Sequence, residues 1–129
     1  MPQPTVLCYD PVGAAWLAKL PAICAVQGLR LRRLEAGHLD LPLADLAQGA
    51  PAGDAPEEVP GEPILVLCRL VPGQLDRLLA ALRKAGVPRT CLKAILTPTN
   101  AGWTLKALYE ELRQERERLG WHFSRKSLL

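Results

Sequence analysis

The residues best placed to do chemistry form a short polar loop, Thr-Pro-Thr-Asn, that follows an apolar segment and leads into a charged helical pattern. Backbone N–H groups at such a strand-to-helix junction can bind an anion. We therefore expect a ligand or partner site on this loop, built on Thr97, Thr99, Asn100 and Trp103. The alternative is an ordinary turn in which Asn100 or Thr104 caps the following helix.

No residue set in the sequence is typical of a catalytic site. His38 lies near Asp40 in a Gly-His-Leu-Asp stretch and His122 lies near the C-terminus, but no serine has the surroundings of a nucleophile elbow. Glycine-rich phosphate-binding motifs are absent. The sequence therefore predicts no catalytic residue and favours a non-enzymatic binding or regulatory module. The alternative is an enzyme of unrecognised type.

The four cysteines have no C-x-x-C spacing and do not cluster with histidine; they are Cys8, Cys24, Cys68 and Cys91. Two lie inside apolar segments and a third lies on an apolar helical stripe. Buried free cysteine behaves as a small hydrophobic residue, so we predict reduced, buried thiols, with neither a metal site nor a cofactor. Reduced thiols fit a cytosolic protein.

The chain of 129 residues is long enough for one domain with a sizeable core, and we expect residues 1–129 to form a single domain. It contains neither a basic stretch before its first apolar segment nor an apolar run of membrane-spanning length. These features predict a cytoplasmic protein without a membrane partner.

The two halves of the chain carry opposite charge. Residues 1–63 hold four basic and eight acidic side chains, net −4, and residues 64–129 hold twelve basic and five acidic ones, net +7. A basic half can bind an acidic partner or pair with the acidic half of the same molecule. Binding of nucleic acid through the basic C-terminal half is a further alternative, but the aromatic and basic stretch near the C-terminus is too short to favour it.

Four short segments have the pattern of strands. The segment 5–9 is apolar from residue 6 onward and residues 64–68 are continuously apolar, as expected for strands buried on both faces of a sheet. Residues 29–34 and 92–96 alternate between apolar and other residues, which is typical of half-buried edge strands. The two strand–helix–strand segments match loosely in outline and suggest a duplicated unit.

Helical spacing of apolar residues follows the strands predicted at 5–9, 64–68 and 92–96. The helix expected over 13–27 contains Pro21, so we predict a kink or two short helices there. The last helix, over about 103–119, carries an apolar stripe of Leu105, Leu108, Leu112 and Leu119. This stripe predicts that the helix covers one face of the sheet, or that a second copy of the chain covers that face in a homodimer.

These elements predict an α+β fold: a ferredoxin-like β-α-β-β-α-β sheet with an added C-terminal helix. The alternative is a four-stranded parallel α/β sheet in which residues 42–48 serve as the crossover. Residues 49–63 hold four prolines, three glycines and four acids, so we expect a mobile loop there. We expect residues from about 120 to 129 to form a C-terminal tail.

The segments EPILVLC, LDRLLAALRKAGV, LKAILTPTNAGWTL and LYEEL resemble a family of small bacterial proteins described as domain of unknown function 3783. The similarity extends to VLCYDP and HLDLPLADLAQG in the first half. The resemblance implies a bacterial protein that forms one compact unit. It implies no activity, so the ligand of the predicted loop, a small molecule or a protein, is not identified by it.

Overall fold

The structure is a computed structural model that describes residues 3–118. Its strands are β1 (Thr5–Tyr9), β2 (Arg30–Leu34), β3 (Ile64–Cys68) and β4 (Leu92–Ile95). Its α-helices are α1 (Leu20–Val26), α2 (Leu43–Ala47), α3 (Pro72–Lys84) and α4 (Leu105–Arg118), and the short 3₁₀ helices are η1 (Ala15–Leu17) and η2 (Ala36–His38). Within these residues, no helix is both long and apolar enough to cross a membrane. The predicted C-terminal tail lies outside the described part of the chain.

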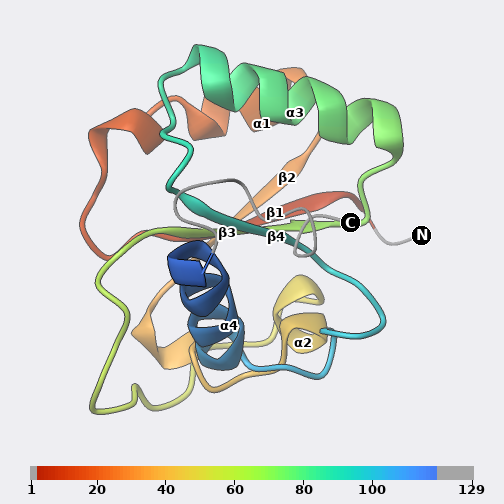
Figure 1. The fold of residues 1–129 in the computed structure, drawn as a ribbon. Helices are drawn as coiled ribbons and strands as arrows, with labels where there is room; N and C mark the ends of the chain where they lie inside the picture. Colours follow the sequence, from red (N-terminus) through yellow and green to blue (C-terminus); the bar gives the residue numbers. More distant parts are fainter. Residues whose placement is uncertain (1–2, 119–129) are drawn as a thin grey trace.

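The four strands form one mixed sheet in the order β2-β1-β3-β4 (Figure 1). β1 pairs with β2 and β3 pairs with β4 in parallel, whereas β1 and β3 are antiparallel. The ferredoxin-like prediction is therefore wrong, and so is the parallel alternative. Each helical crossover returns its strand directly beside the strand it left, and the two resulting β-α-β units meet through their first strands. The expected positions are confirmed: the continuously apolar strands are central and the alternating strands lie at the edges.

Helices cover both faces of the sheet (Figure 1). One face packs against α1 and α3, where Leu20, Leu78 and Leu82 meet apolar side chains of the central strands. The opposite face packs against α2 and α4. Because successive side chains of a strand point to opposite faces, β1 and β3 contribute residues to both clusters.

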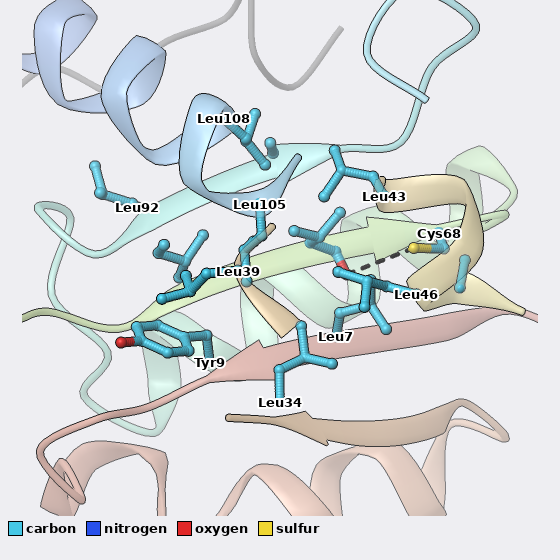
Figure 2. Packing of buried hydrophobic residues seen from close by; sticks show 14 of the residues in the cluster. Leu7, Tyr9, Leu34, Leu39, Leu43, Leu46, Cys68, Leu92, Leu105 and Leu108 are labelled. Atoms are coloured by element: carbon cyan, nitrogen blue, oxygen red, sulfur yellow. Dashed lines mark hydrogen bonds between the residues drawn. The ribbon is translucent and has the colours of Figure 1, made fainter. Parts of the chain in front are cut away.

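The last helix covers the sheet face that its sequence pattern predicted. Leu105, Leu108 and Leu112 are buried in the same cluster as alternate residues of β3 (Figure 2). Each fully buried leucine contributes about 1.5–3 kcal/mol of transfer free energy. The fourth residue of the stripe, Leu119, lies outside the described residues. The chain itself thus covers this face, and a homodimer stays an untested expectation.

The segment over 13–27 forms two short helices, as the proline predicted. The η1 turn ends at Leu17, and α1 begins at Leu20 with Pro21 in its first turn. A proline at that position lacks only an N–H group that would have no partner inside the helix. The segment therefore changes direction between Leu17 and Leu20 before its apolar residues reach the sheet.

The two halves of the chain repeat the same sequence of elements. A glycine of positive φ lies two residues beyond the end of both α1 and α3, Gly28 at 70° and Gly86 at 90°. The residue after each glycine donates its N–H to the carbonyl five positions earlier: Leu29 to Cys24 at 2.8 Å and Val87 to Leu82 at 3.0 Å. This matched helix ending supports the duplicated unit suggested by the sequence, with residues 5–47 as one copy and residues 64–118 as the other.

Backbone hydrogen bonds between the two halves are also matched in pairs. Beneath the sheet, the segments that lead into α2 and α4 run antiparallel and meet at a bridge between Pro42 and Thr104. The N–H of the first residue of each helix donates to the other segment, from Leu43 to Trp103 O at 2.8 Å and from Leu105 to Leu41 O at 3.3 Å. The two units are thus joined twice, through β1 and β3 and through these segments.

The proline-rich segment 49–63 is anchored near both of its ends. At its start, the N–H of Gly53 donates to the carbonyl of Gly37 at 2.8 Å. A Cβ on Gly37 would lie 2.3 Å from the carbonyl oxygen of Gly53, so this approach requires glycine. At its end, the Tyr9 hydroxyl donates to Pro60 O at 2.9 Å. The mobility of the exposed, acidic middle of the segment stays a prediction.

Candidate functional site

The predicted loop forms a turn that is held by its own side chains. The Asn100 Oδ1 accepts the N–H of Thr97 at 2.8 Å, and the Thr97 Oγ1 accepts the N–H of Asn100 at 3.2 Å. The Asn100 Nδ2 donates to the carbonyl of Ile95, the last residue of β4, at 2.9 Å. Asn100 is only 7% exposed. Its side chain therefore fixes the shape of the loop.

The other predicted residues lie in different surroundings. Thr99 is exposed at the tip of the turn, and Trp103 is half-buried against the apolar cluster beneath the sheet. The helix cap is Thr104, whose Oγ1 accepts the N–H of Ala107 at 3.1 Å. Of the two residues expected to cap α4, Asn100 shapes the turn and Thr104 caps the helix. Thr97 is half-buried, as Thr104 is.

The loop lies where the parallel strands β3 and β4 both end. Arg69 directly follows β3 and has a φ of 64°, an uncommon conformation for a residue other than glycine. Beyond it, the chain enters α3 on one face of the sheet, whereas the chain leaving β4 enters α4 on the other face (Figure 1). Such a divergence at the carboxyl ends of adjacent parallel strands is where ligands bind in open α/β sheets.

His38 occupies the position in the first unit that Asn100 occupies in the second. Its Nδ1 accepts the N–H of Glu35 at 2.9 Å, as the Asn100 Oδ1 accepts that of Thr97. Its Nε2 lies 3.2 Å from the Arg32 guanidinium. Burial, and next the charge of Arg32, lower the pKa of His38. His38 is buried while Asp40 is exposed, so the ring has a structural role at this turn. His122 lies outside the described residues.

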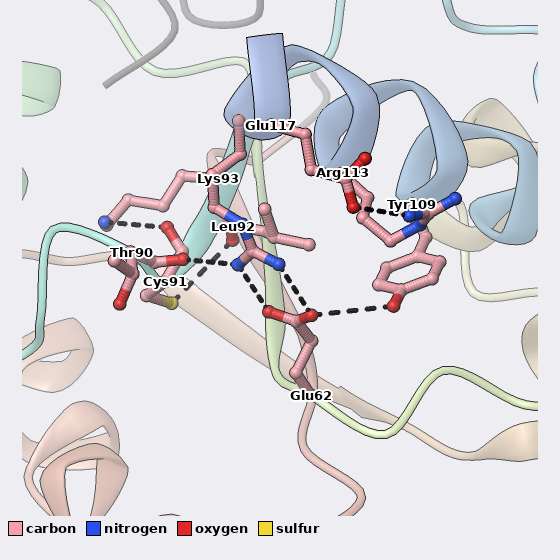
Figure 3. A network of polar contacts seen from close by, with 9 residues as sticks. Glu62, Thr90, Cys91, Leu92, Lys93, Tyr109, Arg113 and Glu117 are labelled. Carbon is pink, nitrogen blue, oxygen red and sulfur yellow. Dashed lines mark hydrogen bonds and ion pairs between the residues drawn. The ribbon is translucent and has the colours of Figure 1, made fainter. Parts of the chain in front are cut away.

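A polar cluster that the sequence did not indicate joins the end of the 49–63 segment to α4 (Figure 3). Arg116 donates to both carboxylate oxygens of Glu62, at 2.6 and 2.9 Å, and to Thr90 O at 2.9 Å. The Tyr109 hydroxyl lies 3.5 Å from the same carboxylate. The hydrogen bonds from Arg116 lower the pKa of Glu62. These residues are far apart in sequence, and no local pattern relates them.

All four cysteines are free and buried, as predicted. Burial raises the pKa of Cys8 and of Cys68 to about 12 and that of Cys91 to about 11, and it also raises the pKa of Cys24. A thiol must ionise to act as a nucleophile, so these side chains are poor candidates for covalent catalysis. Within residues 3–118, no group of three or more His, Cys, Asp or Glu side chains could hold a metal ion.

Replacement of Asn100 with alanine should destabilise the protein by about 1–3 kcal/mol, because it leaves the N–H of Thr97 and the carbonyl of Ile95 without these partners. Thr99→Ala, at the exposed tip of the same turn, is the control and should change the stability by less than about 0.5 kcal/mol. Urea unfolding of both variants measures the difference. Equal stabilities would show that Asn100 does not hold the turn.

The pH dependence of stability should change in His38→Asn. Since folding lowers the pKa of His38 from its ordinary value of 6.5, the unfolded chain takes up the proton first, and the wild type loses stability as the pH falls below 6.5. Asparagine fills the equivalent position in the second unit and does not titrate. Urea unfolding between pH 8 and 5 should therefore give a smaller loss for the variant. Equal losses would contradict this assignment.

Comparison with known proteins gives one family match. Residues 63–119 match the model of the family described as "Domain of unknown function (DUF3783)". No curated protein and no solved structure matches the chain. The matched residues begin just before β3 and run through α4, so they coincide with the second of the two structural units. The similarity noted from the sequence is confirmed over this segment, and residues 63–119 are similar to the family of domain of unknown function DUF3783.

Proposed function

We propose that the protein is a non-enzymatic binding module whose ligand binds at the carboxyl ends of β3 and β4. The observation that carries this proposal is the divergence of α3 and α4 to opposite faces of the sheet directly after these two parallel strands. In open α/β sheets, a ligand binds between the two chain segments at such a point of divergence. The predicted loop lies on one side of this point.

The chemistry of the surrounding residues suits a small polar ligand that carries a negative charge. Thr97 and Thr99 offer hydroxyl groups, which donate and accept hydrogen bonds. Arg69 follows β3 and provides a guanidinium group, which recognises carboxylates and phosphates. Asn100 would act indirectly, by holding the loop in shape, and Trp103 by anchoring the loop on the core.

Two observations weigh against the alternative functions. Burial keeps the cysteine thiols protonated at neutral pH, which disfavours an enzyme that uses them as nucleophiles. Three arginines of the basic half are paired with carboxylates: Arg113 with Glu110 and Glu117, Arg116 with Glu62, and Arg118 with Glu111. Pairing within the molecule reduces the charge that this half could offer to a nucleic acid.

We further infer that the protein works in the bacterial cytoplasm. Its buried, unpaired cysteines suit a reducing compartment. The family resemblance of the sequence supports a bacterial source.

A thermal-shift screen of small phosphorylated and carboxylated compounds tests the proposed function. Compounds that raise the melting temperature of the wild type should bind Thr99→Val and Arg69→Gly at least tenfold more weakly. Valine removes only the hydroxyl, and glycine accepts the positive φ of residue 69 without strain. Arg89→Ala removes an exposed charge elsewhere and is the control. If every compound found binds both variants as tightly as the wild type, the loop is only a turn.

A further inference from the structure

The two outer edges of the sheet differ although the units that form them are equivalent. Most of β4 is buried, and its Lys93 is only 9% exposed. In β2, by contrast, Arg30 and Arg33 are exposed and the two residues between them are half-buried. The sheet therefore has one covered edge and one accessible edge.

Among the described residues, none pairs with the outward backbone groups of β2. The N–H of Arg30 donates inward to Pro4 O at 2.9 Å, so the N–H and C=O groups of Leu31 and Arg33 point outward from the sheet. Within residues 3–118, β2 has no neighbour other than β1. An accessible row of this kind is a template for a further strand.

The equivalent groups of β4 show how an edge is closed in this fold. Its outward carbonyl at Ile95 accepts a hydrogen bond from the Asn100 Nδ2 at 2.9 Å. In the first unit the counterpart of Asn100 is His38, whose Nδ1 accepts the N–H of Glu35. A ring nitrogen that accepts a hydrogen bond in this way cannot also donate one to the Arg33 carbonyl. Asn100 therefore covers the outward carbonyl of β4, whereas His38 does not cover the corresponding carbonyl of β2.

The charge of the accessible edge selects its occupant. Arg30 and Arg33 project to opposite faces of β2, one on each side of the backbone groups. Arg32 is engaged within the protein, where its guanidinium donates to the carbonyls of Leu46 and Ala50. A second copy of β2 would bring arginines against arginines, which destabilises a strand pair. An acidic strand would instead form ion pairs on both faces.

We propose that the outer edge of β2 binds an extended, acidic segment of a partner protein as a fifth strand of the sheet. Main-chain hydrogen bonds to Leu31 and Arg33 would provide affinity, and Arg30 and Arg33 would select acidic side chains. This surface is separate from the proposed ligand site, which lies at the carboxyl ends of β3 and β4. The competing role of the arginines is to protect the edge from pairing with any strand.

The probe is a fluorescein-labelled peptide of eight residues, Glu-Glu-Val-Val repeated twice, so that both faces of the extended peptide carry glutamate. It is titrated with the full-length protein and followed by anisotropy. Saturable binding is expected, with at least tenfold loss in Arg30→Glu/Arg33→Glu. Leu31→Pro removes an outward N–H, together with a half-buried side chain that packs against the apolar cluster, and should cause a similar loss. Arg83→Glu/Lys84→Glu changes the net charge equally, on the exposed end of α3, and is the matched control that should bind as the wild type does.

A second peptide separates strand addition from charge attraction without changing the protein. The same peptide with alternate backbone nitrogens methylated keeps its charge but loses donors, and it should bind at least tenfold more weakly. This comparison distinguishes strand addition from charge attraction even if Leu31→Pro does not fold. Absence of binding, equal binding of the methylated peptide, or equal binding of a Lys-Val peptide would overturn the proposal. So would binding of a single-stranded oligonucleotide by Arg30 and Arg33 when the acidic peptide does not bind.

Discussion

The antiparallel pairing of β1 with β3 is the interaction on which the rest of the structure depends. The pairing runs from Thr5 opposite Cys68 to Tyr9 opposite Ile64, and every residue of both strands is buried. Two strands that are apolar on both faces must be covered on both faces, since each exposed leucine or valine would forfeit about 1.5–3 kcal/mol. The helices of both units supply that cover. The pairing therefore joins two β-α-β units and also requires the layers above and below the sheet.

The equivalence of the two units explains both proposed binding surfaces. The same turn follows the second strand of each unit, but it contains asparagine in one and histidine in the other. Asn100 can accept from the turn and also donate to the strand edge, whereas His38 accepts with its Nδ1 and lies against Arg32 through its Nε2. One unit thus has a closed edge beside a polar loop, and the other has an accessible edge with exposed arginines. The family match covers the unit that contains Asn100, within residues 63–119.

Much of the local structure could be predicted from the sequence, because apolar patterns report burial directly. The two buried strands, the stripe of α4 and the broken helix around Pro21 follow from spacing alone. The order of the strands does not follow, since the observed sheet and a ferredoxin-like sheet use the same elements with the same apolar faces. The turn at Asn100 was predictable from residue type. The sequence could not show that Asn100 holds this turn while Thr104 caps α4, because either residue type can cap a helix. The Glu62–Arg116 pair has no sequence signal, because an ion pair between distant residues leaves no periodicity.

The claim that two units are held together by their central strands can be tested by measuring how fast two native cysteines are alkylated. Cys8 lies in β1 and Cys68 in β3, and their exposed fractions are 1% and 0%. Alkylation under native conditions, followed by peptide mass spectrometry, gives the free energy at which each thiol becomes accessible. Both values should agree with each other and with the free energy of global unfolding from urea titration. If one thiol reacts at least tenfold faster than the other, that unit opens alone, and the account of a shared central pairing is contradicted.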